Sequence, residues 1–151
     1  MIIANNEYRK LPVGIQSFNV IREEGYLYVD KTDMIWKLAN QGFKYNYLSR
    51  PRRFGKSVLI DTLQAYFEGR KDLFEGLKIM ELEKDWKQYP VIRLDMSRGG
   101  ATANEVKAYL DRTFDVYEQL YGIHIKPTDS LGNRFDLIIK TAYKQTGANV
   151  A

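Results

Sequence analysis

A glycine, a lysine and a serine stand together at positions 55–57, and these three residue types suit the binding of phosphate. Gly55 lets the backbone approach a phosphate closely, because it has no Cβ to crowd the oxygens. Lys56 adds a point charge that can reach phosphate oxygens, and the Ser57 hydroxyl is a hard oxygen ligand suited to Mg²⁺. The trio therefore predicts a site for a phosphate group and a magnesium ion.

The residues around this trio predict a loop that leaves a strand and opens a helix. The aromatic-rich run at residues 45–48 is typical of a strand. After Lys56, apolar residues recur at helical spacing up to Phe67, and Gly69 is expected to end that helix. Because the first turn of a helix leaves backbone N–H groups without internal partners, the junction should attract an anion.

The loop itself, residues 50–57, reads RPRRFGKS. It departs from the phosphate-binding pattern G-x-x-x-x-G-K-[ST] at the first position, where Arg50 replaces glycine. One interpretation is an ordinary helix start with a basic loop. The other is a binding site for ATP and Mg²⁺, with the ion on Ser57 and the nucleotide on Arg52, Arg53, Phe54, Gly55, Lys56, Ser57 and Val58.

Five segments of the chain resemble the prokaryotic AAA-ATPase-like family. They read LPVGIQSF (11–18), GYLYVDKT (25–32), YLSRPRRFGKS (47–57), TLQAYFEG (62–69) and PVIRLDMS (90–97). In that family the first glycine of the loop is missing as a rule. The resemblance implies an α/β fold, namely an AAA-like P-loop NTPase with three layers, α/β/α. It also implies that members often carry a restriction-endonuclease-like nuclease domain further along.

The resemblance also predicts how the chain is organised. Residues 1–10 are expected to be loose, and residues 11–151 to form the N-terminal part of the P-loop domain. In the family, the Walker B strand follows, whose aspartate supports Mg²⁺. Since phosphoryl transfer depends on such positioned charges, we expect a fragment with weakened nucleotide binding and very slow hydrolysis, from a parent protein that is an ATPase.

The resemblance to this family also predicts an incomplete sheet with few strands and several helices. The run at residues 91–95 reads as a second strand, with Asp95 and Ser97 as site candidates at its carboxyl end or as turn formers. In the usual strand order of this ATPase class, it would not neighbour the strand at residues 45–48. The exposed edges make self-association an expectation.

Two further stretches read as long helices. Thr102 is expected to cap one that ends at Gly122, and another ends at Gly147. Asp30 or Thr32 is expected to cap a shorter helix that ends near residue 42. A second interpretation of the YVDKT motif places Asp30 and Lys31 near the nucleotide.

Composition limits the class of protein. With 44% hydrophobic and 28% charged residues, no long apolar run and no secretory signal, the sequence is typical of a soluble globular protein with no membrane partner. The absence of cysteine and the single histidine, His124, exclude thiolate and histidine-rich metal sites and favour the cytoplasm.

The net charge of +4 is compatible with an anionic ligand and leaves two alternatives to a nucleotide. The cations Arg50, Arg52, Arg53 and Lys56 could bind nucleic acid or another polyanion as a basic patch. The chain could also be a structural interaction module that binds neither ligand.

Overall fold

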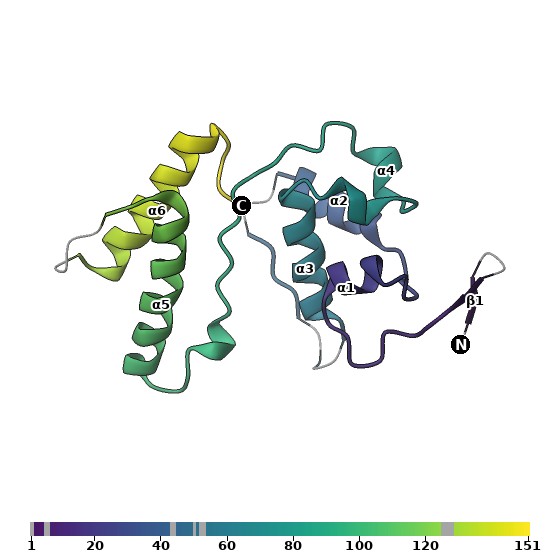
Figure 1. Ribbon diagram of the computed structural model, residues 1–151, viewed down its shortest axis with the longest axis horizontal. Coiled ribbons are helices and arrows are strands. Elements are labelled where there is room, and N and C mark those ends of the chain that lie inside the picture. Colours follow the sequence, from purple (N-terminus) through teal and green to yellow (C-terminus); the bar gives the residue numbers. More distant parts are fainter. Residues whose placement is uncertain (1, 5–6, 43–44, 50, 52–53, 125–128) are drawn as a thin grey trace. The chain divides into compact units, whose positions relative to one another are not determined.

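The chain divides into two compact units, Met1–Gln88 (unit 1) and Tyr89–Ala151 (unit 2). A computed structural model describes residues 2–4, 7–42, 45–49, 51, 54–124 and 129–151 (Figure 1). Unit 1 opens with two antiparallel paired strands, β1 (Ile2–Ala4) and β2 (Glu7–Arg9), within the stretch expected to be loose. None of the helices in the described ranges combines the length and the apolar character needed to cross a membrane.

The rest of the regular structure in the described part of unit 1 is helical (Figure 1). The helices are α1 (Phe18–Glu23), α2 (Thr32–Asn40), α3 (Lys56–Phe67), the 3₁₀ turn η1 (Lys71–Phe74) and the short α4 (Ile79–Leu82). The predicted start of α3 at Lys56 and its end before Gly69 are both confirmed, and Gly69 has the left-handed φ of 70° that glycine tolerates.

An aromatic cluster forms the core of unit 1. The rings of Phe18 and Phe74 are fully buried and their centroids lie 5.0 Å apart. Trp86 packs against Phe74 at 5.1 Å and against Tyr66 of α3 at 5.9 Å. Helices α1, α2 and α3 and the segment of residues 71–79 all contribute buried side chains to this cluster, so it ties them together.

The YVDKT motif fixes the start of α2 to the start of α4. One carboxylate oxygen of Asp30 accepts hydrogen bonds from the Thr32 backbone N–H at 2.9 Å and from its hydroxyl at 2.7 Å. The other accepts from the Lys78 backbone N–H at 2.8 Å, while the buried Thr32 oxygen accepts from the Ile79 backbone N–H at 3.1 Å. The predicted cap is corrected in one respect: Lys31 occupies the N-cap of α2 and makes no side-chain cap bond, whereas Thr32 is the first helical residue. Asp30 bonds the Thr32 backbone N–H from the position before the N-cap, and it also reaches the start of a second helix.

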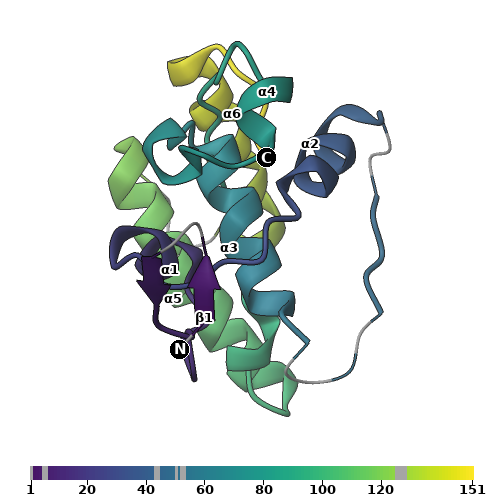
Figure 2. The same cartoon turned by 90° about the vertical axis from the view of Figure 1, so that its right-hand side faces the viewer.

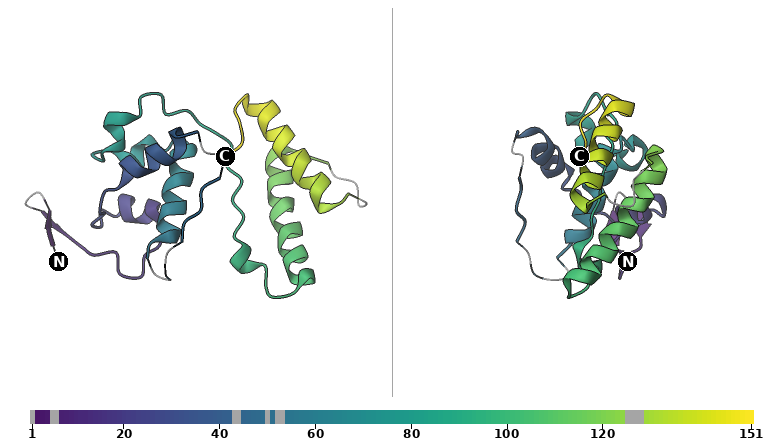
Figure 3. Two further views of the ribbon diagram at one scale, coloured as in Figure 1. Left: turned by 180° about the vertical axis from the view of Figure 1, so that it is seen from behind. Right: turned by 90° about the vertical axis from the view of Figure 1, so that its left-hand side faces the viewer.

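Unit 2 is a pair of helices, α5 (Ala103–Tyr121) and α6 (Leu131–Thr146), which lie side by side (Figure 3). Thr102 caps α5 in a capping box with Glu105, which confirms the predicted start of this helix. Between the helices, Phe114 and Phe135 stack with centroids 5.5 Å apart.

A nearly buried arginine joins the two helices of unit 2. The Arg134 guanidinium on α6 donates to both carboxylate oxygens of Glu118 at 2.8 and 2.9 Å, and to Asp111 and Asp115 on α5 at 2.8 and 2.7 Å. The pKa of Arg134 is raised, mainly by its hydrogen bonds to Glu118, so the guanidinium keeps its positive charge at any accessible pH. This network sets how the helices face each other.

The predicted α/β fold, an AAA-like P-loop NTPase with three layers, is wrong for the part of the chain that the structure describes. The only strands there are β1 and β2, and the rest of the regular structure is helical. Residues 45–49 follow an extended path and form no strand (Figure 2). The side chains of Tyr45 and Tyr47 are more than nine-tenths exposed. Strand propensity describes side chains that suit a pleated surface, and it does not supply a partner strand.

The second predicted strand, residues 91–95, is also absent, and its backbone groups bond elsewhere within unit 2. The N–H groups of Arg93 and Asp95 donate to the hydroxyl oxygens of Tyr117 and Tyr109 on α5, at 2.9 and 2.7 Å. The Ile92 N–H donates to the Ala151 carbonyl at 3.1 Å. Tyrosine side chains and one terminal residue thus take the place of a sheet neighbour.

Replacing Asp30 by asparagine tests the tie between α2 and α4. An asparagine side chain has one acceptor oxygen, so it cannot replace both carboxylate oxygens that accept hydrogen bonds from Thr32 and from the Lys78 backbone. We therefore expect a loss of about 1–2 kcal/mol in the free energy of unfolding. The same change should speed amide hydrogen exchange in residues 78–82. Asp33→Asn, which removes a partly exposed α2 carboxylate paired with Lys37, is the control and should change little.

The pH dependence of this effect has a definite sign. Burial raises the pKa of Asp30, but hydrogen bonds from Lys78 and Thr32 outweigh it, and the net pKa is lowered. A carboxylate with a lowered folded-state pKa stabilises the protein above its unfolded pKa, and this stabilisation is lost as the pH falls through the folded value. The difference between wild type and Asp30→Asn should therefore shrink below about pH 4. A constant difference down to pH 2 would contradict this account.

Replacing Arg134 by methionine tests the network in unit 2. The change keeps most of the side-chain volume but leaves the nearly buried Glu118 without its cation, so we expect a loss of about 3–5 kcal/mol in stability. Thermal unfolding followed by circular dichroism measures it. Arg112→Met, at an exposed position of α5, is the matched control and should stay within about 0.5 kcal/mol of wild type.

Candidate functional site

The GKS turn, residues 55–57, forms the start of α3. Gly55 is the residue before the first helical one, and its φ of 74° and ψ of 18° lie in the left-handed region. An added Cβ would meet nothing within 4 Å, so the requirement for glycine comes from the backbone angle and the space around it is open. Gly55 has no side chain to cap the helix, and the first turn continues with Lys56, Ser57 and Val58.

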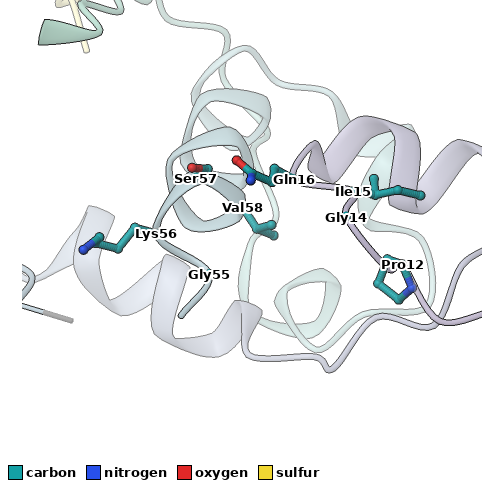
Figure 4. A pocket seen from close by; sticks show the side chains of 8 residues that line it. All are labelled: Pro12, Gly14, Ile15, Gln16, Gly55, Lys56, Ser57 and Val58. Carbon is teal, nitrogen blue, oxygen red and sulfur yellow. The ribbon is translucent and has the colours of Figure 1, made fainter. Parts of the chain in front are cut away.

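A cavity of about 710 Å³ lies against this turn (Figure 4). Residues 55–58 form one wall, and the segment before α1 forms the other through Pro12, Gly14, Ile15 and Gln16. Its described lining contains a lysine, a serine and a glutamine but no acidic side chain. An anion placed here meets no repulsive carboxylate among these residues, so the charge balance suits phosphate.

Lys56 and Ser57 differ in how they face this cavity. Both side chains are exposed at the first turn of α3. In Figure 4 the Lys56 side chain extends away from Pro12 and Ile15. A lysine has four rotatable side-chain bonds, so its ammonium can cover a wide arc around the turn, whereas the shorter Ser57 hydroxyl stays close to the helix end.

A second cavity, the apolar cavity, adjoins the first and has a volume of about 410 Å³. The two cavities are neighbours, because they share the lining residues Pro12, Ile15, Gly55 and Val58. The remaining described lining is mostly aliphatic and aromatic, contributed by α1, α2, α3 and the segments next to them: Ile21, Tyr28, Val29, Lys31, Met34, Ile35, Leu38, Leu48, Phe54, Leu59 and Thr62.

Two of the polar side chains in the apolar cavity are engaged within the protein. The Thr62 hydroxyl donates to the Val58 carbonyl at 2.7 Å, within α3. Burial raises the pKa of Tyr28, and hydrogen bonding with Thr62 acts in the opposite direction. Tyr28 is therefore neutral near pH 7, and the cavity offers an apolar surface with Lys31 at an exposed position.

The predicted site residues fall into two groups. The structure brings Gly55, Lys56, Ser57 and Val58 together around the larger cavity and places Phe54 in the wall of the apolar cavity. Arg52 and Arg53, together with Arg50, lie outside the described residues. The helix half of the predicted strand-to-helix junction is present, and the strand half is not.

The other candidates have structural roles. Asp95 accepts hydrogen bonds from the Ser97 backbone and hydroxyl and caps the 3₁₀ turn η2 (Met96–Arg98), so it acts as a turn former in unit 2. Asp30 is occupied by the contacts between α2 and α4, whereas its neighbour Lys31 lines the apolar cavity. Across the described ranges, no three histidine, cysteine, aspartate or glutamate residues form a metal-binding group.

Reasoning from local patterns missed the wall formed by residues 12–16 and the apolar cavity. Neither carries a periodicity or a motif of charged residues, because both arise from contacts between segments far apart in the sequence. The wall lies within the LPVGIQSF segment, which contributed to the family resemblance. Lys31, which one interpretation of the YVDKT motif placed near the nucleotide, lines the apolar cavity.

Comparisons with known proteins identify the family. The family model described as "Predicted AAA-ATPase" matches residues 12–151. An uncharacterized protein encoded in the 5′ region of vnfD in Azotobacter chroococcum mcd 1 is 39% identical over 145 residues, which are 94% of this chain and 28% of that protein. This chain thus spans less than a third of the relative it matches. No solved structure matches this chain.

The matched region covers both walls of the larger cavity and the whole of α3. The chain therefore belongs to the family of predicted AAA-ATPases.

Proposed function

We propose that the chain binds a nucleoside triphosphate, with the phosphates at the GKS turn. The observation that carries this proposal is the left-handed Gly55 at the start of α3, which opens onto a cavity of about 710 Å³. Phosphate binding at such a place depends on helix-end N–H groups and nearby cations, and these do not require a preceding strand. Membership of a family of predicted AAA-ATPases supports ATP as the ligand.

Each part of the ligand has a group that suits it. The first-turn backbone of α3 would hold phosphate oxygens, and the Lys56 ammonium would neutralise part of their charge. The Ser57 hydroxyl would be one ligand of Mg²⁺, which supplies charge neutralisation and typically keeps phosphate oxygens and waters as its other ligands. The open space beside Gly55 fits this arrangement, since nothing lies within 4 Å of its missing Cβ.

Binding and turnover are separate parts of the proposal. Rapid hydrolysis needs a group that orients the attacking water and charges that stabilise the transition state. The described lining of the larger cavity has no carboxylate for such a role. We therefore propose that these 151 residues bind ATP but hydrolyse it very slowly, and that the parent protein is an ATPase.

Replacing Lys56 by alanine tests the proposal directly. The variant loses the cation next to the phosphates, so we expect the affinity for a fluorescent ATP analogue with Mg²⁺ to fall at least tenfold, as the loss of a charge-assisted contact of about 1.5–3 kcal/mol implies. Fluorescence anisotropy measures it. Lys37→Ala, at an exposed position of α2, changes the net charge equally and should keep wild-type affinity.

Two results would count against nucleotide binding. Equal affinity of wild type and Lys56→Ala would remove the GKS turn from the site. A steep loss of DNA affinity with salt, without competition from ATP, would favour the alternative of a basic patch that binds nucleic acid. Binding of neither ligand would favour a structural interaction module.

A further inference from the structure

We infer that the side-chain amide of Gln16 holds the phosphates from the wall opposite the GKS turn, by donating a hydrogen bond to a phosphate oxygen. The inference rests on the proposed function, because the turn would place the phosphates within the larger cavity. It adds a binding group that the RPRRFGKS loop does not contain and that a separate segment of the chain supplies.

The place of Gln16 in the cavity wall supports a contact with phosphate. Gln16 belongs to the described lining of the larger cavity but not to that of the apolar cavity, whereas its neighbours Pro12 and Ile15 line both. In Figure 4 the amide end of Gln16 points toward the first turn of α3, where Ser57 lies. Phosphates bound at this turn would therefore lie between the helix end and the amide.

The backbone is held in place on both sides of Gln16. Before it, the Ile15 N–H donates to the Pro12 carbonyl at 3.2 Å and closes a β-turn. Gly14 occupies the third position of this turn with a φ of 76°, the left-handed value that a type II turn requires there. After it, Phe18 is fully buried in the core. An ordered backbone lowers the entropy lost on binding, so Gln16 can add affinity although it is exposed.

The chemistry of the amide suits this role. Among the residues that the structure describes, none forms a hydrogen bond with the Gln16 side chain. Its NH₂ group has two donors, and a hydrogen bond to a charged oxygen is stronger than one between neutral groups. Lys56 and the α3 backbone approach a phosphate from one wall, so a donor on the other wall would hold it from the opposite side.

The test measures the affinities for ATP and for inorganic tripolyphosphate, each with Mg²⁺, by isothermal titration calorimetry. Tripolyphosphate has neither base nor sugar, so it reports contacts to phosphate alone. We expect Gln16→Ala to weaken both ligands by about tenfold, the factor for one hydrogen bond to a charged group. Gln16→Glu, which has nearly the same size, should weaken both ligands more than alanine does, because its carboxylate repels phosphate.

Gln41→Glu is the matched control. Gln41 is exposed at the end of α2 and is absent from the described lining of both cavities. The same change of charge there should leave both affinities within about twofold of wild type, because salt screens exposed charges that lie apart. Gln16→Ala should keep the thermal unfolding midpoint of wild type, since its side chain is exposed, which separates a lost contact from a lost fold.

The outcomes separate this inference from the proposed function. If the Gln16 variants bind both ligands as wild type does while Lys56→Ala weakens them, the inference is wrong and the proposed function stands. A loss confined to ATP would assign the amide to the base or sugar, and tighter Mg²⁺-dependent binding by Gln16→Glu would assign it to the metal. Either result would overturn the inference. If wild type binds neither ligand, both the proposed function and the inference fail.

Discussion

One helix, α3, carries both the candidate chemistry and the packing of unit 1. Its first residues follow a left-handed glycine and face an open cavity, whereas Thr62, Ala65 and Tyr66 are buried in the core further along. A helix rises about 1.5 Å per residue and is stiff over such a length. The position of the GKS turn is therefore set by how the second half of α3 is packed, about one and a half to three turns away.

The opposite wall of the larger cavity depends on the same core. Residues 12–16 lead into α1, whose Phe18 is fully buried against Phe74 and also contacts Tyr28 with ring centroids 5.2 Å apart. Tyr28 in turn lines the apolar cavity. Both cavities are thus bounded by segments anchored in one aromatic cluster. A change in that cluster would alter the distance between the walls as well as the stability of the unit.

Local rules predicted the helices well because the signals for helix ends lie next to the ends themselves. Lys56 and Gly69 bound α3, and Thr102 and Gly122 bound α5, where the sequence placed them. Strands could not be predicted in this way, since they require a partner elsewhere. Residues 45–48 have the composition of a strand, yet they have no neighbouring strand in the described part of unit 1.

The candidate site was also predictable only in part, where its residues are neighbours in the sequence. The GKS turn could be found because its residue types carry their own chemistry. The apolar cavity could not, because its members come from segments between Pro12 and Thr62 that share no pattern. The role of Asp30 lay between these cases: a helix cap was expected, but its bond to the Lys78 backbone, 48 residues away, needed the folded structure.

The packing of Trp86 on Phe74 and Tyr66 has an optical consequence. The sequence contains two tryptophans, Trp36 and Trp86, and both belong to unit 1 and pack against its core. Tyrosines, in contrast, occur in both units. Emission excited at the red edge of indole absorption therefore reports on unit 1 alone, and the melting of the helix pair in unit 2 leaves that signal unchanged unless the first unit responds to it.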